Sequence, residues 1–161
     1  MTAEKTYVAI DLEPTKAELG VSSPLHITVT PPVKIEDGML GELTDNLREA
    51  FHSLHPFDVV GGDTDQFGPH EEPVLVRKIV PTDAIRAVHA LALGVMQQTA
   101  PDIDTTYAGE RYKPHSTFKN GYGLGENERR TVDHLTLLRK VGAEWTRIAQ
   151  FNLAGTDEAT A

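Results

Sequence analysis

The sequence predicts a single α+β domain in which most strands pair antiparallel. Short β-branched runs outnumber the amphipathic helical stretches, of which there are two, and hairpin-like Gly and Pro connections separate several of the runs. Strands and helices do not alternate regularly, which disfavours a parallel, doubly wound sheet. A chain of 161 residues buries roughly two-thirds of its unfolded surface as one domain. We therefore expect one domain over residues 1–155 and a frayed tail at residues 156–161.

The first half of the chain contains three predicted strands and one helix. Strands are expected at residues 6–12, 25–30 and 57–62, where β-branched and aromatic residues run between Gly and Pro breakers. A helix is expected at residues 36–54, because apolar side chains recur there at steps of three and four. A segment rich in Gly, Asp and Pro, residues 61–72, should connect this half to the next.

The second half repeats this order loosely. A strand is expected at residues 73–80, and a helix should begin at a cap formed by Thr82 or Asp83 and end before Pro101. A loop should follow. The remaining predicted elements are a strand within residues 111–120, a Gly-rich turn at residues 121–126, and a closing hairpin of residues 131–141 and 145–153 around Gly142.

The composition narrows the chemistry and the cellular setting. The chain has no cysteine, which excludes disulfides, thiolate nucleophiles and cysteine-based metal centres. Its net charge of -9 argues against binding a long nucleic acid duplex through many phosphates. No run approaches about 18 consecutive apolar residues, and the first residues lack the basic and apolar regions of a signal peptide. We expect a cytoplasmic monomer without membrane contacts.

Two of the predicted strands each carry a histidine and a threonine two residues apart. These pairs are His26 with Thr28 and His115 with Thr117. Side chains alternate faces along a strand, so the members of each pair point the same way, about 6.6 Å apart along the backbone. Two such strands facing each other would offer two imidazoles and two hydroxyls to one small anion. The spacing suits a phosphate.

A third His-x-Thr occurs at His134 and Thr136. Leu135 and Leu137 should face the core, so this pair is expected on a solvated or sheet-surface face of the closing hairpin. One such motif is weak evidence on its own. The first two differ in setting, because each closely follows a proline and each lies in a different half of the chain.

Basic and aromatic residues near the second motif are candidates for substrate contacts. Arg111 and Lys113 could contact a second phosphate of an oligonucleotide, and they equally suit ordinary strand-edge solubility. Aromatic side chains could stack on a base, although each equally suits packing. The aromatic candidates are Tyr112, Tyr122 and Phe67, with Tyr107 as an outside candidate.

No metal or other cofactor is expected. Neither motif has a His-Glu-x-x-His sequence or a carboxylate cluster nearby. His70 belongs to a loop that should face solvent. The expected structural histidines are His52, His55 and His89.

The residues around both motifs resemble a known family. Residues 24–29 (PLHITV) and 114–118 (PHSTF) are similar to the paired H-x-T-hydrophobic motifs of the 2H phosphoesterase superfamily. The likeness is to its LigT-like group of 2′-5′ RNA ligases and cyclic phosphodiesterases. It extends to the order of elements and to the pattern from Leu135 to Leu153, and so covers roughly residues 6–153.

The resemblance implies a bilobal fold of two pseudo-symmetric lobes, each an antiparallel sheet with outer helices, around a central cleft. It implies that His26 and His115 form an acid/base pair and that Thr28 and Thr117 bind the phosphate. Relatives often carry an arginine shortly after the second motif. Asn120 stands at that place here, which departs from the pattern of a third, cationic phosphate contact.

The implied activity is metal-independent hydrolysis of 2′,3′-cyclic phosphates of nucleotides or RNA ends, reversible to form 2′-5′ linkages. Histidine suits both proton-transfer roles because its unperturbed pKa is about 6.5. Two alternatives stay open, a phosphodiesterase that cleaves cyclic oligonucleotide signals and a non-catalytic module that binds nucleotides or RNA ends. Which histidine is the acid is also left open.

Overall fold

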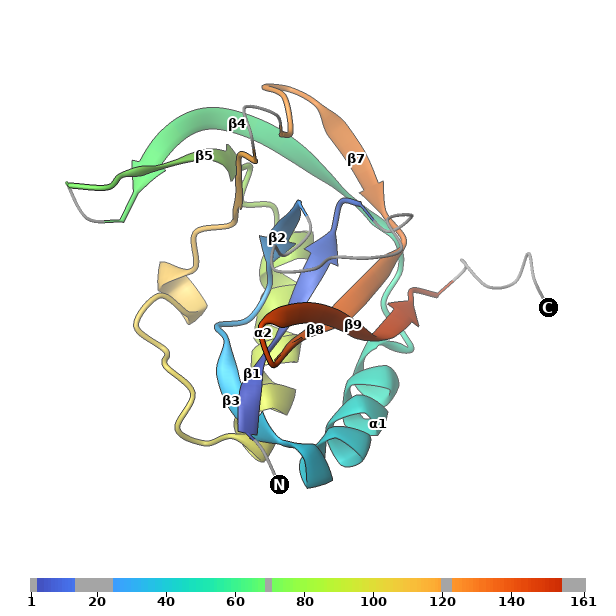
Figure 1. The fold of residues 1–161 in the computed structure, drawn as a ribbon. Coiled ribbons are helices and arrows are strands. Elements are labelled where there is room, and N and C mark those ends of the chain that lie inside the picture. Colours follow the sequence, from blue (N-terminus) through green and yellow to red (C-terminus); the bar gives the residue numbers. More distant parts are fainter. Residues whose placement is uncertain (1–2, 14–24, 69–70, 120–122, 155–161) are drawn as a thin grey trace.

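One curled antiparallel sheet of nine strands forms the frame of the molecule (Figure 1). The computed structural model describes residues 3–13, 25–68, 71–119 and 123–154. The strands are β1 (Ala3–Asp11), β2 (His26–Thr28), β3 (Val33–Glu36), β4 (Phe57–Phe67), β5 (Val74–Ile79), β6 (His115–Thr117), β7 (Arg129–Val132), β8 (His134–Val141) and β9 (Glu144–Asn152). The helices are α1 (Leu40–Phe51), α2 (Asp83–Thr99) and two short 3-10 helices, Asp37–Met39 and Gly109–Arg111. The expected α+β class with antiparallel pairing is confirmed.

The two motif strands lie side by side in the middle of the sheet. The strand order is β7-β4-β5-β6-β2-β1-β8-β9, and β3 pairs with β1 beside this row. The junction between β6 and β2 therefore joins two halves, β7-β4-β5-β6 and β2-β1-β8-β9, into one continuous surface. Each half of the sheet contains strands from both halves of the chain. In one half of the sheet, for example, β8 and β9 from the C-terminal part pair beside β1 from the N-terminal part.

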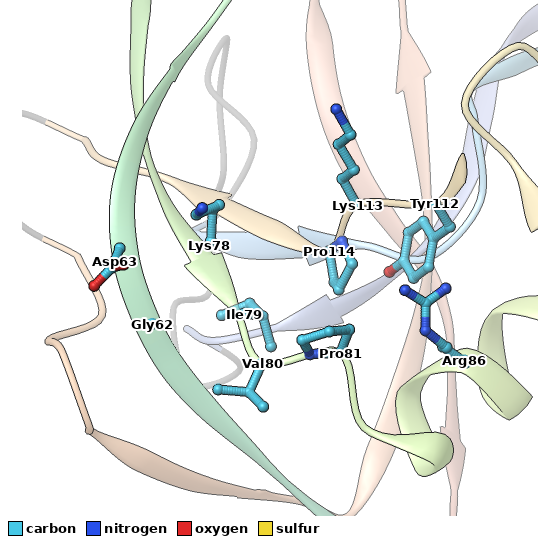
Figure 2. Close-up of a pocket in the computed structure, with 10 residues that line it drawn as sticks. All are labelled: Gly62, Asp63, Lys78, Ile79, Val80, Pro81, Arg86, Tyr112, Lys113 and Pro114. Carbon is cyan, nitrogen blue, oxygen red and sulfur yellow. The ribbon is translucent and has the colours of Figure 1, made fainter. Parts of the chain in front are cut away.

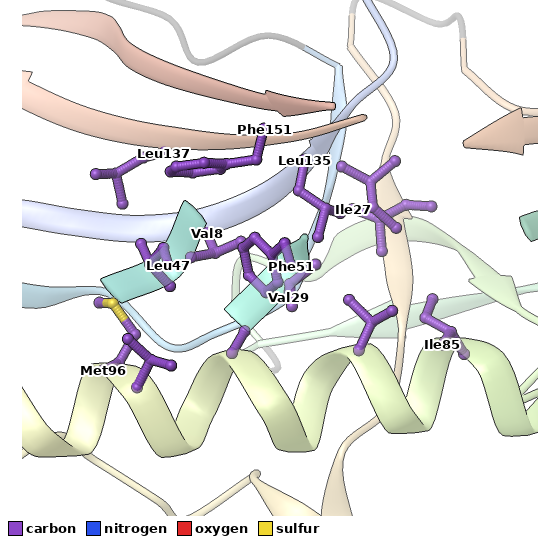
Figure 3. Packing of buried hydrophobic residues seen from close by; sticks show 14 of the residues in the cluster. Val8, Ile27, Val29, Leu47, Phe51, Ile85, Met96, Leu135, Leu137 and Phe151 are labelled. Atoms are coloured by element: carbon purple, nitrogen blue, oxygen red, sulfur yellow. The ribbon is translucent and has the colours of Figure 1, made fainter. Parts of the chain in front are cut away.

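Both α-helices contribute to one hydrophobic core beneath the sheet. Figure 3 shows Leu47 and Phe51 of α1 and Met96 of α2 packed toward side chains of the strands. Leu137 and Phe151, from β8 and β9, lie on the sheet side of the same core. Each such fully buried side chain stabilises the fold by about 1.5–3 kcal/mol. The helices therefore cover one face of the sheet, and the opposite face is not covered by them.

Several predicted element boundaries were wrong. β4 continues to Phe67, through the segment expected to be a connector, because residues 64–67 pair with β5 after a bulge that begins at Gly61. The helix expected at residues 36–54 begins as a 3-10 turn and ends at Phe51. The strand β7 was missed; its residues pair with β4 and not within the closing hairpin.

Other local signals were confirmed. The hydroxyl of Thr82 accepts a hydrogen bond from the backbone N–H of Ile85 and caps α2. β8 and β9 form the expected hairpin, and Gly142 has a φ of 63°, a left-handed conformation that glycine adopts without a steric penalty. Among the described residues, no helix has the length and apolar character needed to cross a bilayer. The tail at residues 156–161 lies outside the described residues.

Candidate active site

The pairing of β2 with β6 determines which side chains share a face. Ile27 lies directly opposite Ser116, and both side chains are buried. Ile27 belongs to the core with the helices. Because side chains alternate along each strand, the histidine and threonine that flank Ile27 and Ser116 must project from the opposite face. All four motif side chains therefore lie on the side of the sheet away from the core.

The antiparallel register also arranges these four side chains as a square. With Ile27 opposite Ser116, His26 lies across from Thr117 and Thr28 lies across from His115. The two histidines occupy one diagonal, where positions on adjacent strands are separated by roughly 7–8 Å. The structure thus brings together the four residues that the sequence predicted from positions far apart in the chain.

His26 contacts two hydroxyl groups. Its Nε2 lies 3.2 Å from the phenolic oxygen of Tyr7 and 3.2 Å from Oγ1 of Thr28. Tyr7 comes from β1 and is buried, and its ring packs edge-on against Trp145 at a centroid distance of 5.4 Å. The sequence analysis missed Tyr7. In the sequence, the alternation of side chains along the first strand shows only which face Tyr7 shares. It does not show that the hydroxyl of Tyr7 reaches His26.

His115 is oriented by its own strand and by β4. Its Nδ1 lies 2.8 Å from the backbone carbonyl oxygen of Lys113. A carbonyl only accepts, so Nδ1 carries the proton and Nε2 is the acceptor nitrogen of the neutral ring. The ring of Phe67 packs edge-on against His115 at a centroid distance of 4.6 Å. Phe67, expected near the cleft, is therefore adjacent to a motif histidine.

A buried histidine supports the first motif strand from behind. Nδ1 of His89 donates to the carbonyl of Val29 at 2.7 Å, and its Nε2 accepts from the backbone N–H of Gly109 at 2.9 Å. Burial lowers the pKa of His89, and the positive charge of Arg86 acts in the same direction. The carbonyl of Val29 opposes this only partly. The expected structural role of His89 fits these contacts.

Tyr112 acts with His89 and not as an open stacking surface. Its ring lies flat on the imidazole, with centroids 3.9 Å apart and planes inclined by 5°. Its hydroxyl donates to the backbone carbonyl of Thr28 at 2.7 Å, and burial raises the pKa of this phenol. The side chain is only 7% exposed. Of the two alternatives for Tyr112, stacking on a base or packing, these contacts favour packing, because one ring face and the hydroxyl already have partners.

A cavity of about 160 Å³ opens beside the motif residues on the β2 side. It is lined by Thr28, Val29, Thr30, Pro31, His89, Tyr107, Tyr112, Lys113 and His115. Tyr107 is 71% exposed, so its ring is available to a ligand. The outside aromatic candidate is thus better placed for stacking than the buried Tyr112.

The remaining predicted contacts are dispersed. Lys113 is exposed and lines the cavity, whereas Arg111 is exposed on the adjacent 3-10 helix and does not line it. Tyr122 and Asn120 lie outside the described residues. Lys78, which the sequence analysis did not single out, lies directly opposite His115 in the pairing of β5 with β6. A strand that is distant in the sequence therefore places a cation beside the second motif.

The third His-x-Thr lies on the same face of the sheet as the two motifs. Thr136 pairs with Ala9 of β1, and Ala9 in turn pairs with Thr28. Thr136 is buried, so of the two expected alternatives, a solvated face or a sheet-surface face, this residue fits the sheet surface. His134 is half-buried, and its Nδ1 lies 2.7 Å from a carboxylate oxygen of Asp133.

One family model matches the chain. The model of the 2'-5' RNA ligase superfamily matches residues 19–128, which is more than half of the chain. No curated protein sequence matches the chain significantly.

Solved structures share the fold at low sequence identity. Escherichia coli LigT in complex with 3'-AMP has 14% identity and a TM-score of 0.68, over 94% of this chain and 99% of that one. TT0787 of Thermus thermophilus has 13% identity and a TM-score of 0.64, with the same coverage. A structure described as a phosphoesterase has 14% identity and a TM-score of 0.66, over 93% and 98%. With the family match and the two paired His-x-Thr strands, these findings establish that the chain belongs to the 2'-5' RNA ligase superfamily of 2H phosphoesterases.

Proposed function

We propose that the chain is a metal-independent phosphodiesterase that opens 2′,3′-cyclic phosphates of nucleotides or RNA ends. The observation that carries this proposal is the pairing of Ile27 with Ser116, which projects two histidines and two threonines from one face. Binding a phosphate alone does not require two titrating imidazoles. The two imidazoles lie at opposite ends of one diagonal of the square, and this arrangement supports proton transfer on both sides of a phosphorus atom.

The phosphate would lie between the two motif strands. Thr28 and Thr117 each have a hydroxyl that can donate to a non-bridging oxygen, where negative charge grows in the transition state. Lys78 lies beside His115 and adds positive charge at this edge.

The hydrogen-bond pattern suggests how the proton roles divide. Nδ1 of His115 is committed to the carbonyl of Lys113, so Nε2 of the neutral ring is a lone-pair acceptor. We assign His115 as the base that takes a proton from water. Nε2 of His26 faces two hydroxyls that can accept as well as donate, which is compatible with the protonated acid.

The reaction then balances in one displacement. Water loses a proton to His115 and forms a new bond to phosphorus, while the bond from phosphorus to one ribose oxygen breaks. His26 gives its proton to that oxygen. When a 5′-hydroxyl attacks the cyclic phosphate in place of water, the bond from phosphorus to the 3′ oxygen breaks and a 2′-5′ linkage forms. Joining two ends in this way needs no nucleoside triphosphate. Each positioned proton transfer typically contributes about 10² to 10⁴ in rate.

The cavity on the β2 side supports nucleoside binding. Thr28 and His115 form part of its wall, so a group in it is next to the reacting phosphate. The exposed ring of Tyr107 offers a stacking face for a base. Solved complexes of LigT contain 3'-AMP, NADP+ and ATP, and this nucleotide chemistry fits a base in the cavity here.

The test is turnover of nucleoside 2′,3′-cyclic phosphates and of an RNA with a cyclic phosphate end, in excess EDTA. His26→Ala and His115→Ala should each reduce kcat at least 10²-fold, because each removes one proton transfer. His134→Ala is the matched control, since it removes a histidine from the same face of the sheet outside the motif pair. Loss of activity on chelation, or activity that survives in the motif variants, contradicts the mechanism.

Two outcomes would redirect the proposal. Binding of cyclic phosphates without turnover from pH 5 to 9 would indicate a non-catalytic module. Turnover confined to cyclic oligonucleotides would assign the same histidines to a different phosphodiester.

A further inference from the structure

A second cavity, of about 300 Å³, lies on the other side of the segment that leads into β6 (Figure 2). It is lined by Gly62, Asp63, Lys78, Ile79, Val80, Pro81, Arg86, Tyr112, Lys113 and Pro114. The cavity lies between the middle of β4, the end of β5, the first turn of α2 and the residues that precede His115. Figure 2 shows Arg86 beside the ring of Tyr112. It also shows Lys78, which belongs to β5, the strand that pairs with β6.

The two cavities flank the reacting residues from opposite sides. β6 lies between β2 and β5 in the sheet. The smaller cavity uses residues 28–31 that begin in β2, whereas the larger one uses residues 78–81 at the end of β5. Tyr112 and Lys113 line both, and Lys78 is paired with His115. A substrate held at the motif square can therefore extend in two directions.

The larger cavity is cationic in a chain that is strongly acidic overall. Lys78, Arg86 and Lys113 line it, against one carboxylate, Asp63. Within the part of the chain that the structure describes, none of the three cationic side chains forms an ion pair or a side-chain hydrogen bond with a neighbour. The net charge of the chain is -9. Three cations against one carboxylate around one hollow create a local field that favours an anion.

The shape of a nucleotide matches this division. In a nucleoside 2′,3′-cyclic phosphate, the base leaves the ribose at C1′, next to C2′, and the 5′ carbon leaves at C4′, next to C3′. Both groups are on the ring face opposite the cyclic phosphate. With that phosphate at the motif square, the base and the 5′ oxygen therefore leave from the two ends of the ribose and diverge from each other. The smaller cavity, which has the exposed ring of Tyr107, suits the base, and the larger cavity, which has Lys78 and Arg86, suits the 5′ group.

We infer that the larger cavity binds a phosphate on the 5′ oxygen of the nucleoside that carries the reacting phosphate. This inference rests on the proposed function and narrows its substrate class. Preferred substrates carry a second phosphate, supplied either by the preceding linkage of an RNA chain or by a 5′-phosphorylated mononucleotide. Lys78 and Arg86 are the residues that distinguish such substrates from a plain nucleoside cyclic phosphate.

The kinetic test compares three substrates: adenosine 2′,3′-cyclic phosphate, its 5′-phosphorylated form, and the dinucleotide ApA with a terminal cyclic phosphate. The wild type should prefer both substrates that carry a 5′ phosphate by about tenfold or more in kcat/KM. Arg86→Gln and Lys78→Gln should each reduce that preference several-fold. Lys34→Gln removes the same charge from an exposed position on β3 and should keep the preference. A further gain for the dinucleotide identifies RNA ends as the source.

A binding measurement separates failure of this inference from failure of the proposed function. Calorimetry compares adenosine 3′-phosphate with adenosine 3′,5′-bisphosphate, neither of which needs turnover. The bisphosphate should bind about tenfold tighter to the wild type, and Arg86→Gln should remove most of that difference. Lys78 is exposed, so Lys78→Gln repeats the test without touching the core.

Three results overturn the inference: equal binding of both ligands by the wild type, a preference that survives in both cavity variants, or a kinetic preference for the dinucleotide alone. If no cyclic phosphate is turned over but the bisphosphate preference is present and sensitive to Arg86, the phosphodiesterase assignment fails and the phosphate site stands.

Discussion

Acidification should weaken the support that His89 gives to the first motif strand. The neutral ring donates from Nδ1 to Val29 and accepts at Nε2 from the N–H of Gly109. Protonation would place a hydrogen on Nε2 against the N–H of Gly109 and break that bond. Because burial lowers the pKa of His89 in the folded protein, the unfolded chain takes up this proton first as pH falls.

The size of the effect follows from proton linkage. The stabilising contribution is fully present above the unfolded pKa of about 6.5 and is lost as pH falls below it toward the lower folded value. One proton changes the free energy of unfolding by at most about 1.4 kcal/mol per pH unit. Between pH 7.5 and 5.5 the loss from His89 is at most about 1.4 kcal/mol, the limit reached when the folded protein binds no proton there.

The assay is urea unfolding at pH 7.5 and 5.5, followed by the fluorescence of Trp145, the single tryptophan. The quantity compared is the loss of unfolding free energy between the two pH values. His89→Gln should show a smaller loss than the wild type by up to about 1.4 kcal/mol, because glutamine does not titrate. His52→Gln alters an exposed histidine and should behave like the wild type. Equal losses in the wild type and His89→Gln would refute the argument.

Two further predictions concern the motif face and the curl of the sheet. Tyr7→Phe removes the hydroxyl that lies 3.2 Å from Nε2 of His26 and keeps the ring. It should lower kcat about tenfold at nearly unchanged stability, and steady-state rates equal to those of the wild type would contradict a role for this contact. Gly61→Ala places a Cβ against the carbonyl oxygen of Gly125, so urea unfolding should show a loss of about 1–3 kcal/mol. Gly41→Ala in α1 has open space around it and should instead stabilise the protein by up to about 1 kcal/mol; the reverse order would show that backbone crowding at the bulge is not limiting.

Local chemistry was sufficient to predict both helices, most of the strands and the motifs. The three-to-four-residue recurrence of apolar side chains predicted both helices, and the hydroxyl of Thr82 marked the start of α2. Pairs of histidine and threonine two residues apart predicted which side chains share a face within a strand. These signals depend only on neighbours in the sequence, so one chain is enough to read them.

The extent of β4 and the existence of β7 were not predictable in this way. Residues 64–66 are polar and suit a loop, and they become strand because β5 lies alongside and satisfies their backbone groups. Likewise, β7 pairs with a strand about seventy residues earlier in the chain. Pairing across such distances overrides the local preference of the segment.

The composition of the candidate site was also decided by tertiary structure. The sequence by itself determined that His26 and His115 each have a threonine on the same side, and it linked them to a family. Only the register of β2 against β6 places those pairs across from each other, and only the neighbouring strands bring Tyr7 and Lys78 beside them. Tyr112 illustrates the converse, since its place in the sequence suited a substrate contact and its stacking on His89 gives it a supporting role. The physical reason is the same in each case: alternation within a strand is local, whereas strand order and register are set by which buried faces the whole chain can cover.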